Sequence, residues 1–442
     1  MKKNRIFILI LTAITLLSCS ENNDDFVDSE IENETTPEIE IENKKPNILL
    51  VIADDMGLDA SPGYSVGTEK PNMPQLQNLI NTGITYNNVW SNPTCSPTRA
   101  TILTGKYGVN NGVLAVNNAL STSEISIQKY LETNLNSEYS SAVIGKWHLS
   151  NNKNHPESMG IDYYSGSLSG TLTDYWNWTL TENETQTTST TYNTTAYTNT
   201  AIDWVEEQTK PWFLWLAYNA PHTPFHLPPT DLHSQGSLPT DQGSIDANPL
   251  PYYLAMLEAM DTEFGRLLNS MSSEEKENTV IIFIGDNGTP NQVAQEYNSK
   301  RVKGSLYQGG INVPMVIAGK NVTRVNETEN ALINTTDLFA TIANIAGVNV
   351  DKINDSNSFY ESFSNSTTKV REYAYAEDEF NVTIRNNTHK YMLFEDGSES
   401  LFNLAEEPLE TKDLLKANNL PLSESDSKIK DELVEKLAEI NP

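Results

Sequence analysis

Cys95 is the residue whose surroundings most strongly suggest chemistry. The chain around it reads Pro93-Thr94-Cys95-Ser96-Pro97-Thr98-Arg99, and Thr104-Gly105 close the segment. The other cysteine, Cys19, lies near the N-terminus. With no second internal cysteine to form a disulfide, Cys95 must serve packing or its own reactivity.

Four oxygen-bearing side chains follow two apolar runs. Asp54 and Asp55 come directly after residues 48–53, and Asp286 and Asn287 come shortly after residues 279–284. Continuous apolar runs are typical of strands buried on both faces of a parallel sheet, and such sheets bind ligands at their carboxyl edge. Carboxylate and amide oxygens suit hard divalent cations such as Ca²⁺, and no His and Cys cluster favours zinc. The pattern predicts a site for a hard divalent cation.

A helix is expected to begin near Cys95. Pro97 suits a first helical turn, because its missing N–H costs nothing there. Cys95 would then lie at a helix N-terminus, which favours an anion. Arg99, one turn inside, carries a charged fork that can brace groups at that position.

The spacing Cys-x-Pro-x-Arg-x-x-x-x-Thr-Gly resembles the signature of the type I sulfatases, which belong to the alkaline-phosphatase-like superfamily. Three further segments resemble motifs of that family: Gly145-Lys146-Trp147-His148, Ala220-Pro221-His222-Thr223-Pro224 and Lys303-Gly304-Ser305-Leu306-Tyr307-Gln308-Gly309-Gly310. The resemblance extends from Pro46 to about Glu410. Within the family, the chain resembles bacterial carbohydrate sulfatases.

The resemblance implies a set of site residues. Cys95 would be converted by a formylglycine-generating maturase to formylglycine, the nucleophile. One Ca²⁺ would be held by Asp54, Asp55, Asp286, Asn287 and the modified Cys95. Roles in catalysis and substrate binding would fall to Arg99 as a brace, Lys146 and Lys303 as sulfate-binding cations, His222 as acid for the leaving oxygen, Asp286 as acceptor of the nucleophile's proton, and His148 in releasing sulfate.

The expected fold is α/β, with a large mixed, mostly parallel sheet sandwiched by helices. Residues 46–355 would form the catalytic domain, and residues 356–442 a smaller antiparallel sheet with a terminal helix. Helices are expected over residues 74–80, 97–103, 251–268 and 336–346. Residues 166–200, rich in Thr, Asn and Tyr, are expected to form a long loop or hairpin.

The N-terminus predicts export. Residues 1–18 have the basic start and short apolar stretch of a secretory signal, and their end resembles a bacterial lipobox, which would make Cys19 the lipidated first residue. Residues 19–45 are mostly acidic and polar and are expected to form a disordered tether. The predicted location is the outer membrane of a Gram-negative bacterium, facing the cell surface or, as the alternative, the periplasm, with a lipid anchor as the only membrane contact.

The net charge and the predicted export limit the kinds of partner that the protein can have. A formal net charge of −30 argues against nucleic-acid binding. Sulfated carbohydrate, such as oligosaccharides of ulvan, carrageenan or fucoidan, is the expected substrate. One alternative is a phosphodiesterase or phosphonate hydrolase on the same fold, although the intact cysteine motif favours sulfate. The other is a catalytically silent glycan-binding lipoprotein, which would have lost polar site residues; every mapped position keeps a competent one.

Overall fold

The computed structural model describes residues 44–366 and 369–442. Cys19, the expected signal peptide and nearly all of the expected tether lie outside the described residues. The last two residues of that tether are described, and both form ion pairs: Lys44 with Glu274 and Lys45 with Glu138. Within the described ranges, no helix is both long and apolar enough to cross a membrane.

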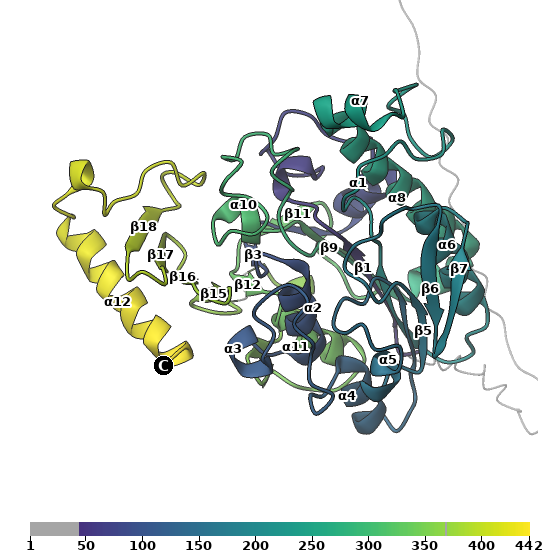
Figure 1. Cartoon of the computed structure of the whole chain (residues 1–442). Coiled ribbons are helices and arrows are strands. Elements are labelled where there is room, and N and C mark those ends of the chain that lie inside the picture. Colours follow the sequence, from purple (N-terminus) through teal and green to yellow (C-terminus); the bar gives the residue numbers. More distant parts are fainter. Residues whose placement is uncertain (1–43, 367–368) are drawn as a thin grey trace, which may run out of the picture. The chain divides into compact units, whose positions relative to one another are not determined.

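A ten-stranded sheet forms the centre of the fold (Figure 1). Its order is β11 (Glu327–Glu329), β2 (Ile84–Tyr86), β10 (Met315–Gly319), β9 (Thr279–Gly285), β1 (Asn47–Ala53), β8 (Trp212–Ala217), β4 (Ser140–Gly145), β5 (Tyr163–Gly166), β6 (Trp178–Glu182) and β7 (Thr185–Ser189). The strands from β9 to β5 run parallel, and antiparallel strands flank them. The predicted mixed, mostly parallel sheet is therefore confirmed.

Helices cover both faces of this sheet. Side chains alternate between the two faces along each central strand, so alternate residues belong to two different cores. Leu49 and Val51 of β1 belong to a core shared with α1, α6 and α8. Ile48 and Leu50 belong to the core on the other face, shared with α2, α4 and α11. The bounds of these helices are α1 (Pro74–Thr82), α2 (Cys95–Thr104), α4 (Ile127–Asn134), α6 (Asn193–Glu206), α8 (Leu250–Ser270) and α11 (Asp337–Ile345).

The C-terminal part is the expected antiparallel sheet with a helix. It consists of β15 (Ala374–Glu377), β16 (Val382–Arg385), β17 (His389–Leu393), β18 (Glu399–Asn403) and α12 (Glu424–Ile440). One face of the sheet packs on Leu433 and Leu437 of α12, and the other packs around Trp90 and Leu306. Contacts group residues 44–442 into one compact unit, and the boundary between residues 355 and 356 stays a prediction.

The segment 166–200 differs from the expectation in its last part. Its middle is a hairpin, β6 and β7, as expected, but α6 begins at Asn193. The helix exists because Tyr197, Ala201 and Trp204 bury one face against the sheet, so tertiary packing overrides the weak helix propensity of Thr and Asn.

The remaining elements are short. They are β3 (Val89–Trp90), β12 (Ile333–Asn334), β13 (Lys352–Ile353), β14 (Ser356–Asn357), α3 (Gly108–Asn111), α5 (His155–Ser158), α7 (Gln242–Ala247), α9 (Ser273–Glu277), α10 (Gln308–Ile311) and the 3-10 turns η1 (Leu58–Ala60), η2 (Tyr360–Phe363) and η3 (Ala417–Asn419).

Candidate active site

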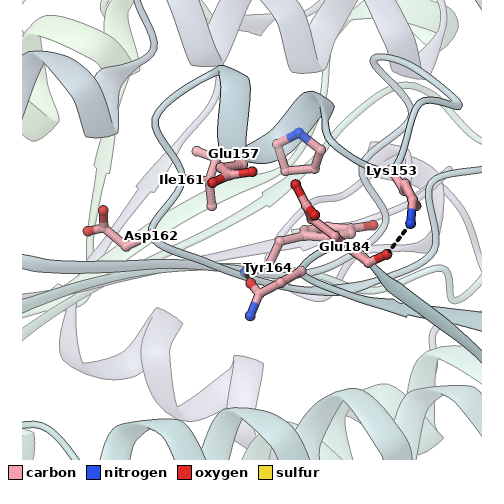
Figure 2. Close-up of a pocket in the computed structure, with 8 residues that line it drawn as sticks. Lys153, Glu157, Ile161, Asp162, Tyr164 and Glu184 are labelled. Carbon is pink, nitrogen blue, oxygen red and sulfur yellow. Dashed lines mark hydrogen bonds between the residues drawn. The ribbon is translucent and has the colours of Figure 1, made fainter.

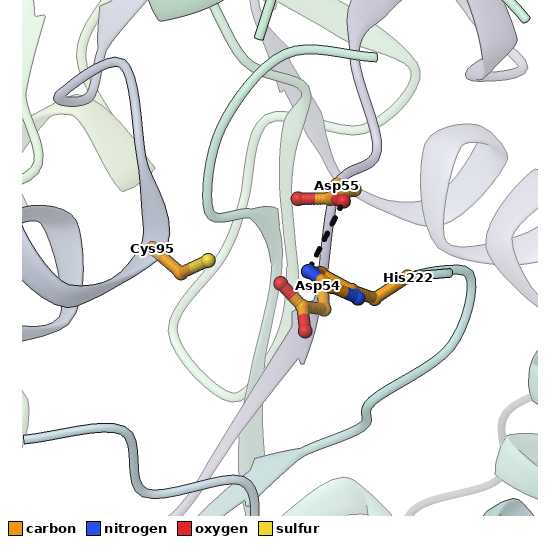
Figure 3. Close-up of side chains that lie close together, drawn as sticks. All are labelled: Asp54, Asp55, Cys95 and His222. Carbon is orange, nitrogen blue, oxygen red and sulfur yellow. Dashed lines mark ion pairs between the residues drawn. The ribbon is translucent and has the colours of Figure 1, made fainter. Parts of the chain in front are cut away.

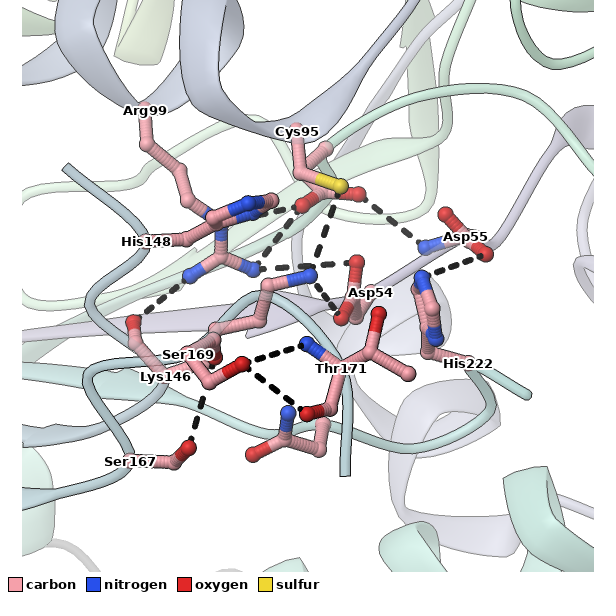
Figure 4. A network of polar contacts seen from close by, with 12 residues as sticks. Asp54, Asp55, Cys95, Arg99, Lys146, His148, Ser167, Ser169, Thr171 and His222 are labelled. Carbon is pink, nitrogen blue, oxygen red and sulfur yellow. Dashed lines mark hydrogen bonds and ion pairs between the residues drawn. The ribbon is translucent and has the colours of Figure 1, made fainter. Parts of the chain in front are cut away.

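Four neighbouring parallel strands deliver polar residues to one edge of the sheet. In the order β9, β1, β8 and β4, these strands are followed by Asp286, by Asp54, by the loop of His222 and by Lys146. Parallel strands end at the same edge, so residues far apart in the chain meet there. Figure 4 shows this convergence, with Cys95 and Arg99 reaching in from α2.

A compact group of possible metal ligands lies at this edge. One atom each from Asp54, Asp55, Cys95 and His222 lies within 4.8 Å of the others, and all four residues are buried (Figure 3). Asp54 Oδ1 and Asn287 Oδ1 are buried without a hydrogen-bond partner. Buried oxygens are normally paired, so two such atoms in one acidic site fit the donor set of a hard cation.

Lysines reinforce the site with positive charge. Lys146 Nζ lies 2.5 Å from Asp54 Oδ2 and 3.3 Å from Cys95 Sγ, and Lys303 Nζ lies 2.5 Å from Asp55 Oδ2. Burial alone would raise the pKa of Asp54, but nearby cations, Lys146 foremost, outweigh it and hold that pKa well below its usual range. Desolvation opposes a raised pKa for Lys303, but the charge of Asp55 prevails and raises it, so the amine keeps its proton.

Cys95 is the first residue of α2, as the sequence predicted, and Pro97 lies in the first turn. Its side chain is 2% exposed. Burial raises the pKa of the Cys95 thiol to about 12, although Lys146 opposes the shift. A thiol with this pKa is protonated at neutral pH and is a weak nucleophile. The unmodified side chain is therefore poorly suited to attack an ester itself.

Arg99 connects three parts of the site. Its guanidinium donates to Asp286 Oδ2 and to the carbonyl oxygen of Lys146. Arg99 thus holds Asp286 and the end of β4 in place, and its expected bracing of the modified Cys95 stays a prediction.

His148 is held in an unusual conformation. Its φ of 56° places it in the left-handed region, which non-glycine residues seldom adopt. Since the side-chain oxygen of Asn117 only accepts, Nε2 of His148 donates to it at 3.0 Å, which leaves Nδ1 as an unpartnered acceptor. Burial, reinforced by Lys146 and Arg99, lowers the pKa of His148 to about 2, so the ring is neutral.

His222 lies beside the two neighbouring carboxylates, Asp54 and Asp55. Its Nδ1 donates to the Thr223 carbonyl oxygen at 2.8 Å, so Nε2 faces the site, 3.7 Å from Asp55 Oδ2. Burial lowers the pKa of His222, and the charges of Asp55 and Asp54 oppose this shift. The backbone carbonyl of His222 accepts a hydrogen bond from Tyr175 Oη at 2.7 Å.

Three residues of this site were missed by sequence reasoning. Asn117 contacts His148, Tyr175 contacts His222, and Gly170 lies so close to His148 that a Cβ there would be 2.1 Å from the ring. All three lie in segments that resemble no motif, and nothing in the sequence links them to their partners. Figure 4 shows the segment carrying Ser167 and Thr171 beside Lys146.

A separate pocket lies beside β5 and does not share these residues (Figure 2). Its charged lining consists of Lys153 and three carboxylates, Glu157, Asp162 and Glu184. Lys153 Nζ donates to the Glu184 carbonyl, and contact with Glu184 raises the pKa of Glu157. An excess of negative charge disfavours an anionic ester here, so the edge around Cys95 is the better candidate.

Comparison with known proteins agrees with this assignment. The sequence profile of the Sulfatase family matches residues 46–348. A protein named Sulfatase from Formosa agariphila is 26% identical over 486 residues, covering 85% of each chain, and rat arylsulfatase G is 25% identical, covering 74% of this chain and 68% of that protein. The crystal structure of Ps i-CgsB in complex with k-i-k-neocarrahexaose has a TM-score of 0.72 at 25% identity, covering 90% of this chain and 94% of the other.

Proposed function

This chain belongs to the sulfatase family, whose members hydrolyse sulfate esters, and we propose that it removes sulfate from carbohydrate with a calcium-dependent site built around a modified Cys95. The observation that carries the proposal is the position of Cys95, at a helix N-terminus, 3.3 Å from Lys146 Nζ and beside buried acidic oxygens. That combination attracts both an anionic ester and a cation.

The two groups that the family implies fit the residues present. Ca²⁺ would be held by Asp54, Asp55, Asp286, Asn287 and residue 95, and the unpartnered oxygens of Asp54 and Asn287 support this ligand set. Formylglycine made from Cys95 would supply the hydroxyl that attacks sulfur, while Ca²⁺ would neutralise negative charge. The inertness of the buried thiol is consistent with a need for this conversion.

The chain's own side chains would then divide the remaining work. Lys146 and Lys303 bring positive charge to the sulfate oxygens. His222 Nε2 faces the site and donates the proton that the leaving oxygen needs; the negative charge of an arriving sulfate ester favours the protonated ring. Asp286, positioned by Arg99, accepts the proton of the attacking hydroxyl.

His148 has its role in the release of sulfate. Its Nδ1 has no hydrogen-bond partner and the ring is neutral, so its lone pair is available. The negative charge of a bound sulfate ester would raise the lowered pKa and favour uptake of the proton from the second hydroxyl of residue 95 as sulfate is released. The bond from Nε2 to Asn117 fixes the tautomer that this role requires.

Sulfated oligosaccharides of algal polysaccharides are the substrates we propose, with carrageenan first, then ulvan and fucoidan. The support is the likeness to Ps i-CgsB, whose complex contains a neocarrahexaose. A crystal structure of PsFucS1 sulfatase from Pseudoalteromonas sp., 19% identical with a TM-score of 0.70, shares the fold.

Export and lipidation at Cys19 are part of the same proposal, with the outer membrane of a Gram-negative bacterium as the location. A maturase would act on Cys95 during biogenesis. Metabolic labelling with a fatty-acid analogue tests the anchor: wild type should incorporate label, and Cys19→Ala should not. Labelling of Cys19→Ala equal to wild type would contradict it.

The test of function joins two measurements on protein co-produced with a formylglycine-generating enzyme. Peptide mass spectrometry across residue 95 should detect the aldehyde. Ion chromatography should detect sulfate released from oligosaccharides of carrageenan, ulvan or fucoidan, with 4-nitrophenyl phosphate as the control for phosphatase activity. Unmodified Cys95 despite an active maturase, or faster cleavage of the phosphate ester, would overturn the proposal.

A further inference from the structure

We propose that Trp176 is a sugar-stacking residue on the leaving-group side of the active site. The inference rests on the proposed function and extends it, because it assigns a binding position for a pyranose ring. Trp176 is the only exposed tryptophan of the seven in the chain, with 37% of its surface accessible; the other six are buried.

Trp176 leaves part of a large and rigid indole ring accessible, and such rings combine a wide apolar face with a polar N–H. Trp176 is fixed in place: its backbone N–H donates to Asp174 Oδ1 at 2.7 Å. Its ring centroid lies 5.0 Å from that of His226 and 5.0 Å from that of Tyr192. These three residues form an aromatic group in which Tyr192 is buried, His226 is partly buried and Trp176 is the most exposed.

The aromatic group is connected directly to the catalytic loop. Tyr175, the neighbour of Trp176, donates through Oη to the carbonyl oxygens of Asn219 and His222, at 2.9 and 2.7 Å. The Tyr175 ring also lies 4.2 Å from the ring of His226. Tyr175 thus links Trp176 to the loop that carries His222.

A bound substrate would extend from Cys95 past His222 toward Trp176. With sulfate held by Lys146 and Lys303 beside residue 95, the leaving oxygen faces His222, and the sugar attached to it extends beyond His222. The accessible ring there is that of Trp176, and indole rings stack on the C–H face of pyranoses.

Neighbouring polar atoms suit a sugar. His226 Nε2 and Tyr192 Oη form a hydrogen bond of 3.1 Å, and Asp174 offers carboxylate oxygen beside them. Asp174 has no ion pair among residues 44–366 and 369–442, so its charge disfavours a second sulfate at this position. The proposed occupant is therefore a ring that presents hydroxyls and carries no anionic group on the stacked face.

The test compares Trp176→Ala with Trp176→Phe, which keeps an aromatic ring. Fully matured protein is assayed for sulfate release from di- to hexasaccharides of carrageenan, ulvan and fucoidan. We expect Trp176→Ala to raise KM about tenfold with little change in kcat, as loss of a stacking contact predicts, and Trp176→Phe to retain most of the affinity. Melting temperature and formylglycine content should match wild type in both variants.

A second measurement does not depend on turnover. In the Cys95→Ala background, affinity electrophoresis in gels that contain the parent polymers should show retardation that Trp176→Ala abolishes. Unchanged KM and unchanged retardation in Trp176→Ala would overturn the stacking role while leaving the sulfatase function intact. Wild type that neither cleaves nor binds any of these carbohydrates would overturn both.

Discussion

Arg99 and Asp286 are joined by two hydrogen bonds inside the protein. Arg99 Nη2 and Nε lie 2.8 and 3.1 Å from Asp286 Oδ2, and both side chains are fully buried. A third bond, from Nη1 to the Lys146 carbonyl at 2.8 Å, ties α2 to the end of β4. One side chain thus fixes the relative positions of the nucleophile's helix and two strand ends.

Removing this guanidinium should destabilise the fold. Arg99→Met leaves Asp286 buried without its cation and should lower the free energy of unfolding by about 3–5 kcal/mol. Arg99→Lys keeps the charge but loses the fork and should cost less. Denaturant unfolding after removal of calcium with EGTA checks both variants. Equal stability of Arg99→Met and wild type would show that the pair contributes nothing.

Substitution of Cys95 should abolish turnover without unfolding the protein. Cys95→Ala removes the atom from which the nucleophile is made, and Cys95→Ser offers a single hydroxyl where the hydrated aldehyde has two. Both variants should lose at least about 10³-fold in kcat. Their melting temperatures should lie within a few degrees of wild type, because only one small side chain changes. Sulfate release by Cys95→Ala at the wild-type rate would sink the mechanism.

Calcium should stabilise the folded chain. Ligand that binds only the native state adds about 2.7 kcal/mol at a hundredfold excess over Kd. After chelation with EGTA, adding Ca²⁺ should raise the melting temperature of wild type and restore activity. Asn287→Ala removes one unpartnered oxygen and should need more Ca²⁺ for the same shift. A melting temperature that does not change when Ca²⁺ is added would contradict the proposed calcium site.

The elements that deliver the site were predictable because their sequences leave few alternatives. The apolar runs 48–53 and 279–284 are too hydrophobic to be exposed on either face, and they became β1 and β9. Polar residues placed directly after such strands must meet at one sheet edge. The position of Cys95 as the first residue of α2 followed from Pro97.

Contacts between loops were not predictable in this way. The helix over Asn193–Glu206 depends on burial of Tyr197 and Trp204, which a single sequence does not reveal. The partner of His148 is Asn117, 31 residues away in an irregular segment. No periodicity connects such positions, because their contact depends on how two loops pack after the sheet has formed.

Gly170 should be intolerant of a side chain. A Cβ at this position would lie 2.1 Å from Cε1 and Nε2 of His148, so Gly170→Ala must displace the ring or the segment that covers it. Displacement of a catalytic group by about 1 Å can cost about 10²-fold in rate, and we expect kcat to fall by that order. Gly243→Ala, whose Cβ would meet only Asp241 Oδ1 at 3.4 Å, is the matched control. Full activity of Gly170→Ala would show that His148 is not held by this segment.

His226 should make stability depend on pH. Burial lowers the pKa of His226 to about 4, although the Pro224 carbonyl and the charge of Asp174 oppose the shift. Nδ1 donates to that carbonyl and Nε2 accepts from Tyr192 Oη, so the folded state requires the neutral ring. The unfolded chain takes up this proton near pH 6.5, before the folded chain does. The stabilisation is therefore complete above pH 6.5 and is lost as the pH falls toward 4.

The measurement is denaturant unfolding at pH 4.5, 5.5 and 7 for wild type and His226→Gln, whose side chain does not titrate. Between pH 7 and 4.5, wild type should lose about 2 kcal/mol more than the variant, an order-of-magnitude figure from the size of the shift. Other acidic groups titrate equally in both proteins, so the difference isolates His226. Identical pH profiles would mean that the ring takes up a proton in the folded state as readily as in the unfolded chain, and that the bond from Tyr192 does not keep it neutral.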